Sequence, residues 1–584
     1  MDKVRTFNLL LFLISYVYCR FFLTTYLLYL KTFLPVNGGL GVRRTMQLSL
    51  LLASTFLIPA SLDVVTAKNV DSTIVLNKGI LTGSPRDANG ILAFKSIPFA
   101  EPPLGHLRWR PPLPMAPWNG ALNATEFGFS CWSALLDTPV PTTQSEDCLT
   151  INVWTAARQR NERLPVMVWI YGGGFQFGAS ALATYDGTVF AQKGVVLVSF
   201  NYRLGVLGFL ALEELDMEGT PSGNFGLQDM QAALKWVREN IDAFGGDPDN
   251  ITIYGESAGA HAIGLLMSSP RSRSLFHKAV MESGAWWDRN HGSLPTFDEA
   301  RQFGDSFKTK VGVDSAAELR ETPPQSLVDA SPFSFNQDPG VDNFSPNIDG
   351  YVLPTAPGYA FQHGQQMKIP LMAGWNADEQ FTFLGLALPH QNAVQYESAA
   401  EMLFACRMPE FLSLYPDSPS ASLNASSGAL VGDMMIREQT WEAADLQQRS
   451  GIPEVFVYYF TYASAYSPLA SHTAEVPFVF GNLGTIPIYL TAPAAQFSLE
   501  DRAFSQHVMS YWTNFAKQGN PNNESAGLPT WPPYRSGRND ILELGNTITP
   551  INYGLDRFRY IQSFRDNGTF PLGWRRLNVS ASGQ

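Results

Sequence analysis

Short, mostly apolar runs recur along much of the chain. Each is four to eight residues long and lacks the strict alternation of apolar and polar residues that marks a strand with one solvated face. Continuous apolar strands are typical of sheets covered on both faces, and the helix-length segments between them favour a mainly parallel α/β sheet. The predicted strands are 164–171, 195–200, 251–254, 278–282, 369–373 and 455–460.

One segment between these strands carries the repeat of an amphipathic helix. Its apolar residues recur at spacings of three and four, which places them on one helix face that packs against the sheet. Gly245 and Gly246 end the pattern. Residues 290–365 and 385–450 have weaker strand patterns, so we expect helical or irregular insertions there. The apolar helix positions are Leu227, Met230, Leu234, Val237, Ile241 and Phe244.

Two apolar stretches precede this body. The first, 7–34, is long enough to cross a bilayer, but Arg20 would place a charge near the middle of the membrane. The second, 48–60, follows two arginines and precedes small residues, which is the order of a secretory signal peptide and its cleavage site. The expected divisions are 1–45, a gene-model extension or a membrane anchor; 46–67, a signal peptide; and 68–584, one folded body.

Composition and charge narrow the class of protein. The chain has 584 residues, of which 45% are hydrophobic and 16% charged, so we expect a globular protein and not a disordered one. Its 4 cysteines are too few for a disulfide-rich scaffold. A formal net charge of −12 without basic runs argues against nucleic acid as a partner.

N-glycosylation sequons follow the predicted signal peptide and agree with export, although such triplets also arise by chance in long chains. Asn250 and Asn343 are the weaker acceptors because of their sequence contexts. Secretion is the predicted destination, and anchoring through the N-terminal apolar segment is the alternative. The candidate glycosylation sites are Asn123, Asn424, Asn523, Asn567 and Asn578.

The pentapeptide Gly-Glu-Ser-Ala-Gly at 255–259 follows a predicted strand and precedes a helical segment. The pattern G-x-S-x-G alone arises by chance, but between a strand and a helix it predicts a nucleophile elbow. Such a turn holds Ser257 in a strained backbone conformation and projects its hydroxyl above the sheet. The amide of Ala258, at the start of the helix, would face the negative charge that develops on a substrate carbonyl.

A second glycine-rich segment fits the same chemistry. The predicted strand 164–171 runs directly into Gly172-Gly173-Gly174. Successive glycines let backbone amides approach a ligand closely, as the oxyanion hole of an acyl-transfer enzyme requires. A flexible turn after the strand is the alternative, but the elbow at 255–259 favours the oxyanion hole.

These motifs and their order resemble the type-B carboxylesterase family, the cholinesterase-like branch of the α/β-hydrolases, from Ser72 to Tyr534. The resemblance implies one α/β-hydrolase domain over residues 68–584, with a large, mostly parallel central sheet, helices on both faces and helical insertions. The matching segments are AFKSIPFAEPPLGHLRWRPP (93–112), SEDCLTINVW (145–154), VWIYGGGF (168–175), NYRLGVLGF (201–209), the run 223–259, NADEQF (376–381), SHTAEVPFVFG (471–481) and WTNFAKQGNPN (512–522).

The resemblance also implies a catalytic triad. Ser257 would be the nucleophile, Glu379 the acid and His472 the general base, with Asp378 as the alternative acid. The order serine, acid, histidine is the one expected for this fold, and each residue follows a predicted strand, so all three can meet at one sheet edge. The oxyanion donors would be the amides of Gly173, Gly174 and Ala258.

Other matching positions are structural in the family. The resemblance implies a disulfide between Cys131 and Cys148, which leaves Cys406 without a partner in the predicted mature chain. It also implies two buried ion pairs and a set of polar side chains behind the triad. The ion pairs are Arg108–Glu146 and Arg203–Asp229, and the supporting residues are Glu256, Ser283 and Glu475.

Departures from the family pattern bear on the substrate. The segment between Cys131 and Cys148 is short and rich in proline, unlike the long flap of the family's lipases. Its only tryptophan, Trp132, stands at its start, whereas cholinesterases have one late in the loop for cation–π binding of choline. Trp286 and Trp287 either line the acyl side of the pocket or fill the core.

We therefore predict a secreted serine hydrolase that cleaves carboxylic esters through an acyl-enzyme. The alternatives are a lipase for longer acyl chains and a non-catalytic binding or adhesion protein on the same fold. The presence of all three triad candidates favours the enzyme. The predicted partner is a small-molecule ester, no metal or organic cofactor is indicated, and membrane contact is expected only if residues 1–45 are a real anchor.

Overall fold

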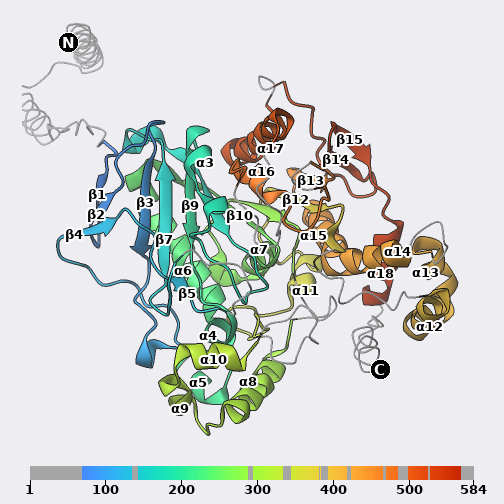
Figure 1. Cartoon of the computed structure of the whole chain (residues 1–584), viewed down its shortest axis with the longest axis horizontal. Helices are drawn as coiled ribbons and strands as arrows, with labels where there is room; N and C mark the ends of the chain where they lie inside the picture. Colours follow the sequence, from blue (N-terminus) through green and yellow to red (C-terminus); the bar gives the residue numbers. More distant parts are fainter. Residues whose placement is uncertain are drawn as a thin grey trace, which may run out of the picture. The chain divides into compact units, whose positions relative to one another are not determined.

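A ten-stranded sheet forms the centre of the domain that follows Thr66 (Figure 1). The computed structural model describes residues 69–133, 142–286, 294–332, 344–380, 382, 392–416, 423–464, 468–484, 497–523 and 527–566. The strands are β3 (Leu92–Pro98), β7 (Thr150–Thr155), β8 (Leu164–Ile170), β9 (Val196–Phe200), β10 (Gly246–Glu256), β11 (Lys278–Glu282), β12 (Leu371–Asn376), β13 (Val455–Phe460), β14 (Asp540–Leu544) and β15 (Ile548–Asn552).

The spatial order of the sheet is β15-β14-β13-β12-β11-β10-β8-β9-β7-β3. All pairs from β14 to β9 are parallel, whereas β15 at one edge and β7 and β3 at the other pair antiparallel. Every residue of β9, β11 and β12 is buried, so both faces of the central sheet are covered. This arrangement confirms the predicted α/β-hydrolase fold.

All of the predicted strands are present, but the strands at the sheet edges and β14, which pairs parallel with β13, were not predicted. Asp540 and Glu543 interrupt the apolar residues of β14. β3 and β15 contain half-buried or exposed positions, so they lack a continuous apolar run. β7 is buried throughout, yet threonine and asparagine interrupt its apolar residues. Antiparallel edge strands can leave positions in contact with solvent, which weakens the pattern that identifies buried parallel strands.

Helices pack against the sheet on its covered faces. α6 (Phe225–Asn240) and α7 (Ala258–Ser268) contact β10, while α15 (Glu438–Arg449) contacts β12 and β13. α3 (Thr188–Gln192) packs on β7 and β9, and α17 (Leu499–Gln518) on β8 and β10. The predicted helix stripe 227–244 is confirmed as α6, followed by the short 3₁₀ turn Ile241–Phe244.

The two predicted insertions contain helices joined by irregular segments, such as 344–356, where the structure describes them. The first contains α8 (Phe297–Val311), α9 (Ala316–Glu321), α10 (Pro324–Ala330) and α11 (Pro357–Gln362). The second contains α12 (Ala393–Phe404), α13 (Met408–Leu414) and α14 (Leu423–Gly432), and a π-helix, Asp433–Arg437, links α14 to α15.

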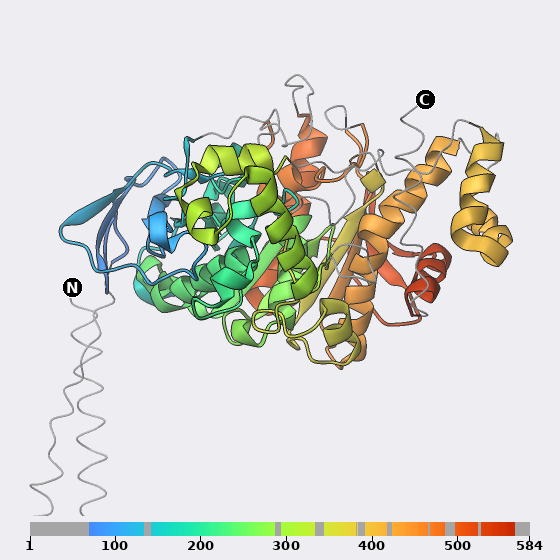
Figure 2. The same cartoon turned by 90° about the horizontal axis from the view of Figure 1, so that it is seen from below.

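Smaller elements complete the domain. A three-stranded sheet, β1 (Thr73–Leu76), β2 (Gly79–Gly83) and β4 (Ala121–Ala124), lies on the opposite side of the domain from α12 and α13 in both views (Figures 1 and 2). The other strands and α-helices of the described residues are β5 (Ser130–Cys131), β6 (Gln144–Ser145), α4 (Gly205–Phe209), α5 (Glu213–Asp216), α16 (Val476–Phe480) and α18 (Asp556–Asp566).

The predictions for the N-terminal segments lie outside the described residues, as do Trp287, Asn343, Asn567, Asn578 and the side chain of Asn424. The signal peptide, the anchor and these sequons therefore stay predictions. Within the ranges given above, no helix combines the length and apolarity needed to span a membrane.

Candidate active site

Ser257 occupies a sharp turn between β10, which ends at Glu256, and α7, which begins at Ala258. Its backbone has φ 54° and ψ −122°, a combination that costs a non-glycine residue free energy and persists only where the surrounding structure enforces it. The Ser257 amide donates to the carbonyl of Glu282 on β11 at 2.9 Å, which fixes the turn to the neighbouring strand. The predicted strand–turn–helix context of the serine is confirmed.

The flanking glycine Gly259 lets α7 lie against the sheet. A Cβ atom at this position would overlap with the carbonyl oxygen of Ile170, at the end of β8. The close approach of helix and strand therefore requires glycine at position 259.

The glycine loop after β8 lies directly beside the serine. A Cβ on Gly172 would stand 3.0 Å from the Cβ of Ser257. Gly173 and Gly174 have φ of 108° and 62°, so the loop uses backbone conformations that side chains disfavour. The structure thus brings the two predicted glycine-rich segments together around Ser257.

His472 and Glu379 meet in the interior, although they are 93 residues apart in sequence. Nδ1 of His472 lies 2.6 Å from Oε2 of Glu379, and the two residues are 3% and 0% exposed. The backbone amide of Asn376 donates to the other carboxylate oxygen, Oε1, at 2.7 Å. The carboxylate is held from both sides, which fixes the direction in which it faces the imidazole.

Asp378, the alternative acid, points elsewhere. Its Oδ2 accepts a 3.0 Å hydrogen bond from the amide of Ala470, and its own amide donates to the Ala470 carbonyl at 2.8 Å. Asp378 and Ser471, which are far apart in sequence, form an isolated parallel β-bridge. Asp378 therefore joins the loop after β12 to the loop that carries His472. Of the two adjacent carboxylates, Glu379 is the one in contact with the histidine.

The other ring nitrogen of His472 faces the residue before the serine. Nε2 lies 3.2 Å from Oε1 of Glu256, which is 4% exposed. Since Nδ1 donates to Glu379, a hydrogen bond between Nε2 and Glu256 requires a proton on one of these two atoms. Glu256, expected only as a supporting residue, is thus in direct contact with the imidazole.

Carboxylates dominate the electrostatics around His472. Burial alone would lower its pKa, but the charges of Glu256, Glu379 and Glu475 raise the pKa from the ordinary 6.5 to about 9. Burial raises the pKa of Glu256 well above its usual range, against the opposing effect of His472. The charges of the two groups are coupled, so loss of the His472 proton with rising pH makes Nε2 able to accept a proton.

Glu475 and Ser283, predicted as supporting residues, are buried and connect to Glu379 through Asn376. The Ser283 hydroxyl donates to Oε1 of Glu475 at 3.2 Å, and the side-chain amide of Asn376 donates to Oε2. Burial, with a further contribution from Glu379, raises the pKa of Glu475 to about 7. Asn376 binds both Glu379 and Glu475, a role that sequence reasoning missed; its place at the start of the NADEQF segment was the available signal.

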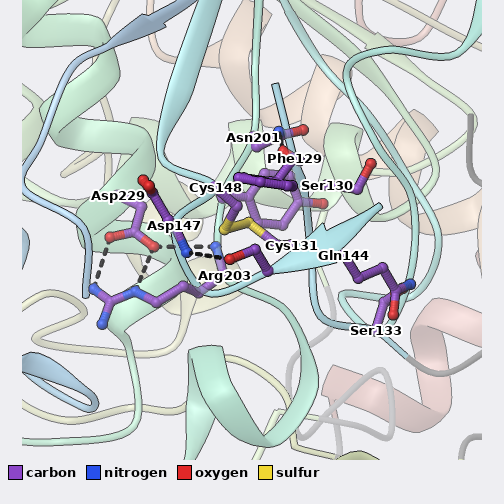
Figure 3. Close-up of a disulfide and its surroundings, with 12 residues drawn as sticks. Phe129, Ser130, Cys131, Ser133, Gln144, Asp147, Cys148, Asn201, Arg203 and Asp229 are labelled. Atoms are coloured by element: carbon purple, nitrogen blue, oxygen red, sulfur yellow. Dashed lines mark hydrogen bonds and ion pairs between the residues drawn. A yellow bond between two sulfur atoms is a disulfide. The ribbon is translucent and has the colours of Figure 1, made fainter. Parts of the chain in front are cut away.

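The predicted disulfide and both predicted ion pairs are present. Figure 3 shows the disulfide with the Arg203–Asp229 pair close to it. Cys131 and Cys148 are bonded, and Cys406 is an exposed free cysteine. Arg203 pairs with Asp229 through bonds of 2.8 and 2.7 Å. The second pair, Arg108–Glu146, is bidentate at 2.7 and 2.6 Å.

Trp286 is a core residue. It is fully buried and packs against Phe361 of α11 with ring centroids 4.8 Å apart, which excludes direct contact with solvent in a pocket. Among the residues that the structure describes, no group of three His, Cys, Asp or Glu side chains is arranged as metal ligands.

Comparison with known proteins agrees with this architecture. The sequence matches the Carboxylesterase family over residues 70–560. It is 34% identical over 510 residues to the fumonisin B1 esterase of Sphingopyxis macrogoltabida, covering 85% of this chain and 91% of that protein. It is 35% identical over 478 residues to the para-nitrobenzyl esterase of Bacillus subtilis (strain 168), covering 80% and 93%, and 32% identical over 554 residues to the acetylcholinesterase of Electrophorus electricus, covering 80% and 83%.

Solved structures of PNB esterase resemble the fold across nearly their full length. Two of them superpose with TM-scores of 0.72 and 0.70 at 32% identity, covering 84% of this chain and 99% of theirs. Fold, family match and relatives agree with one another. The chain belongs to the carboxylesterase family and is a carboxylic ester hydrolase.

Proposed function

We propose that this enzyme hydrolyses carboxylic esters through an acyl-enzyme formed on Ser257, with His472 as general base and Glu379 as the triad acid. One observation carries the proposal. The buried Glu379 carboxylate holds Nδ1 of His472 at 2.6 Å, while Nε2 is directed to Glu256, the immediate neighbour of Ser257. A buried carboxylate that orients a histidine against the residue preceding a strained serine supports activation of that serine's hydroxyl.

In the first half of the reaction, Nε2 of His472 takes the proton from the Ser257 hydroxyl as its oxygen attacks the ester carbonyl. Glu379 fixes the tautomer of His472 and stabilises the imidazolium that forms. The amides of Gly173, Gly174 and Ala258 would donate to the carbonyl oxygen as it becomes negative. The imidazolium then gives its proton to the leaving alcohol, and the acyl group stays on Ser257.

In the second half, a water molecule attacks the acyl-enzyme. His472 takes a proton from this water, and the same amides stabilise the second tetrahedral intermediate. Collapse of the intermediate breaks the bond to Ser257 Oγ, which recovers its proton from His472 and releases the carboxylic acid. The carboxylate of Glu256 adds to the stabilisation of the imidazolium in both halves, because it faces the same nitrogen.

For the substrate we propose small-molecule esters. Two relatives are named a fumonisin B1 esterase and a para-nitrobenzyl esterase, and a third is named an acetylcholinesterase, so the names of the relatives agree on ester hydrolysis but not on one substrate. The segment after Cys131 is too short for a lipase flap and carries no late tryptophan for choline. Both departures point away from lipid droplets and from quaternary ammonium groups.

We further propose that the protein is secreted and glycosylated. Asn123 and Asn523 are exposed and so accessible to modification. Asn250 is half-buried and its side chain bonds Lys278 and the backbone of Lys517, which supports its standing as a weaker acceptor. The disulfide between Cys131 and Cys148 agrees with an oxidising compartment.

The test of the catalytic proposal is covalent labelling with a fluorophosphonate probe, followed by turnover of p-nitrophenyl esters of increasing acyl length. We expect stoichiometric labelling that Ser257→Ala abolishes, with kcat reduced at least about 10³-fold. Ser268→Ala, on the same helix, should retain labelling because its hydroxyl donates to the Gly264 carbonyl and not to the proposed triad. A folded wild-type protein that neither labels nor turns over any ester would refute the proposal, and activity confined to long-chain esters at an interface would replace it with a lipase.

A further inference from the structure

A buried arginine connects a distant helix to the loop that carries Glu379. Arg437 lies at the end of the π-helix Asp433–Arg437, and its side chain is 3% exposed. Its Nη2 donates to the carbonyl of Ala377 at 2.6 Å and to Oε1 of Gln380 at 2.7 Å. Its Nε donates to the carbonyl of Asn376 at 3.2 Å. The guanidinium therefore holds residues on both sides of Glu379.

The opposite edge of the guanidinium is anchored by a buried carboxylate. Nη1 of Arg437 donates to Oδ1 of Asp433 at 2.7 Å, and Asp433 is 0% exposed. The other oxygen of Asp433 accepts from the Tyr415 hydroxyl at 2.9 Å and from Nε of Arg557, on α18, at 3.0 Å. A buried ion pair with this many partners keeps a fixed geometry, because any displacement would leave a buried charge without a partner or water to solvate it.

The local helix geometry supports a specific role for this contact. A π-helical segment inserted between α-helices is rare and is found frequently at functional sites. Burial alone would lower the pKa of Arg437, but Asp433 raises it above its ordinary value, so the side chain stays charged. Its positive charge also attracts the Glu379 carboxylate, which faces His472 on its other side.

We propose that Arg437 is a positioning residue that holds the 376–380 loop in place so that Glu379 keeps His472 oriented for catalysis. Nothing in the chain's motifs indicates this role, since Arg437 stands on a helix 58 residues after Glu379 in sequence. The inference rests on the proposed function of Glu379. Arg437 itself touches neither reacting atoms nor the imidazole in the contacts described above.

A purely structural role of Arg437 would have different consequences, and Arg557 provides the matched control for it. Arg557 bonds the same carboxylate, Asp433, but belongs to α18 and takes no part in the contacts to the 376–380 loop described above. If Arg437 only stabilises the fold, removal of either arginine should lower stability and leave the activity of each folded molecule alone. If Arg437 positions the loop, only its removal should slow each folded molecule.

The experiment compares Arg437→Gln, Arg437→Lys and Arg557→Gln in the full chain. Fluorophosphonate titration counts the competent sites, so that kcat is expressed for each labelled molecule and does not depend on the folded fraction. For Arg437→Gln we expect kcat to fall roughly 10- to 100-fold with little change in KM. Arg437→Lys keeps the charge beside Asp433 but lacks the planar fork that reaches all three loop acceptors, so kcat should be intermediate. Arg557→Gln should have wild-type kcat and a lower Tm.

Two results would overturn the inference: wild-type kcat in both Arg437 variants, or an equal loss of kcat in Arg557→Gln. If Arg437→Gln does not fold, Arg437→Lys decides alone, and its wild-type kcat would count against the role. Failure of the proposed function is separate, because it would appear as absence of labelling in the wild-type protein itself.

Discussion

Glu256 lies between two parts of the candidate site, since it precedes Ser257 in the chain and faces Nε2 of His472 at 3.2 Å. The negative charge of Glu256 favours the protonated form of His472. This stabilises the imidazolium in the transition state, but at low pH it keeps His472 protonated in the resting enzyme, where it cannot act as a base. The two effects can be separated by the pH dependence of kcat/KM.

We expect kcat/KM to rise with pH as His472 loses its proton, with an apparent pKa well above 6.5 and towards about 9. Glu256→Gln removes one of the charges that raise this pKa, so the rise should move to lower pH by about one unit or more. The plateau kcat should fall, because the imidazolium loses a stabilising charge. Glu239→Gln, on the exposed face of α6, is the control and should leave the profile unchanged; an unshifted Glu256→Gln profile would contradict the assignment.

Gly259 tests the packing of the elbow. In an ordinary helix a change from glycine to alanine stabilises by up to about 1 kcal/mol. Here the added Cβ would overlap with the Ile170 carbonyl, so Gly259→Ala should reverse the sign and destabilise the protein by roughly 1–3 kcal/mol. Urea unfolding measures the change. Gly554→Ala, at an exposed position with open space around it, should stay within about 0.5 kcal/mol of wild type.

At the scale of elements, the disulfide closes the loop that joins β5 to the start of β7. Cys131 and Cys148 are 17 residues apart, and in the chain-entropy argument a loop of this length stabilises by about 3 kcal/mol. The double change Cys131→Ser and Cys148→Ser should therefore lower the free energy of unfolding by about that amount. Cys406→Ser should have no measurable effect, and a disulfide-free variant as stable as wild type would contradict the expectation.

The ion pair between Arg203 and Asp229 joins the loop after β9 to α6. Both side chains are almost completely buried, at 5% and 0% exposure. Asp229→Asn should cost roughly 3–5 kcal/mol, since it leaves the Arg203 charge buried without its partner. Asp249→Asn removes the exposed pairs with Arg163 and Arg238 and should cost under about 1 kcal/mol. Thermal or urea unfolding measures both variants. An equal loss of unfolding free energy in Asp229→Asn and Asp249→Asn would contradict the larger cost expected for the buried pair.

At the scale of the whole molecule, the proposed secretion predicts a defined mature protein. Expression of the full chain in a secreting eukaryotic host should yield protein in the medium that begins at Lys68, after the predicted cleavage site. N-terminal sequencing checks the start, and a mass decrease on treatment with an endoglycosidase checks glycosylation. Retention of the chain in the membrane fraction would favour the anchor interpretation of residues 1–45 instead.

The parallel strands β8, β9, β10, β11, β12 and β13, the elbow and the glycine loop could be predicted from sequence, because each depends on neighbours in the chain. A continuous apolar run identifies a strand buried on both faces, and G-x-S-x-G between a strand and a helix identifies Ser257. The edge strands could not be predicted in the same way, since β3 and β15 have exposed or half-buried positions. Glu379 and His472 came from resemblance to a family and not from any local pattern.

Only the tertiary structure decided which of the adjacent carboxylates Asp378 and Glu379 faces His472, that Glu256 contacts the other ring nitrogen, and that Arg437 binds the Glu379 loop. Local sequence determines backbone conformation and burial through short-range sterics and apolar periodicity. Contacts between residues far apart in the chain depend instead on how the loops at one sheet edge converge, and that convergence is a property of the assembled fold.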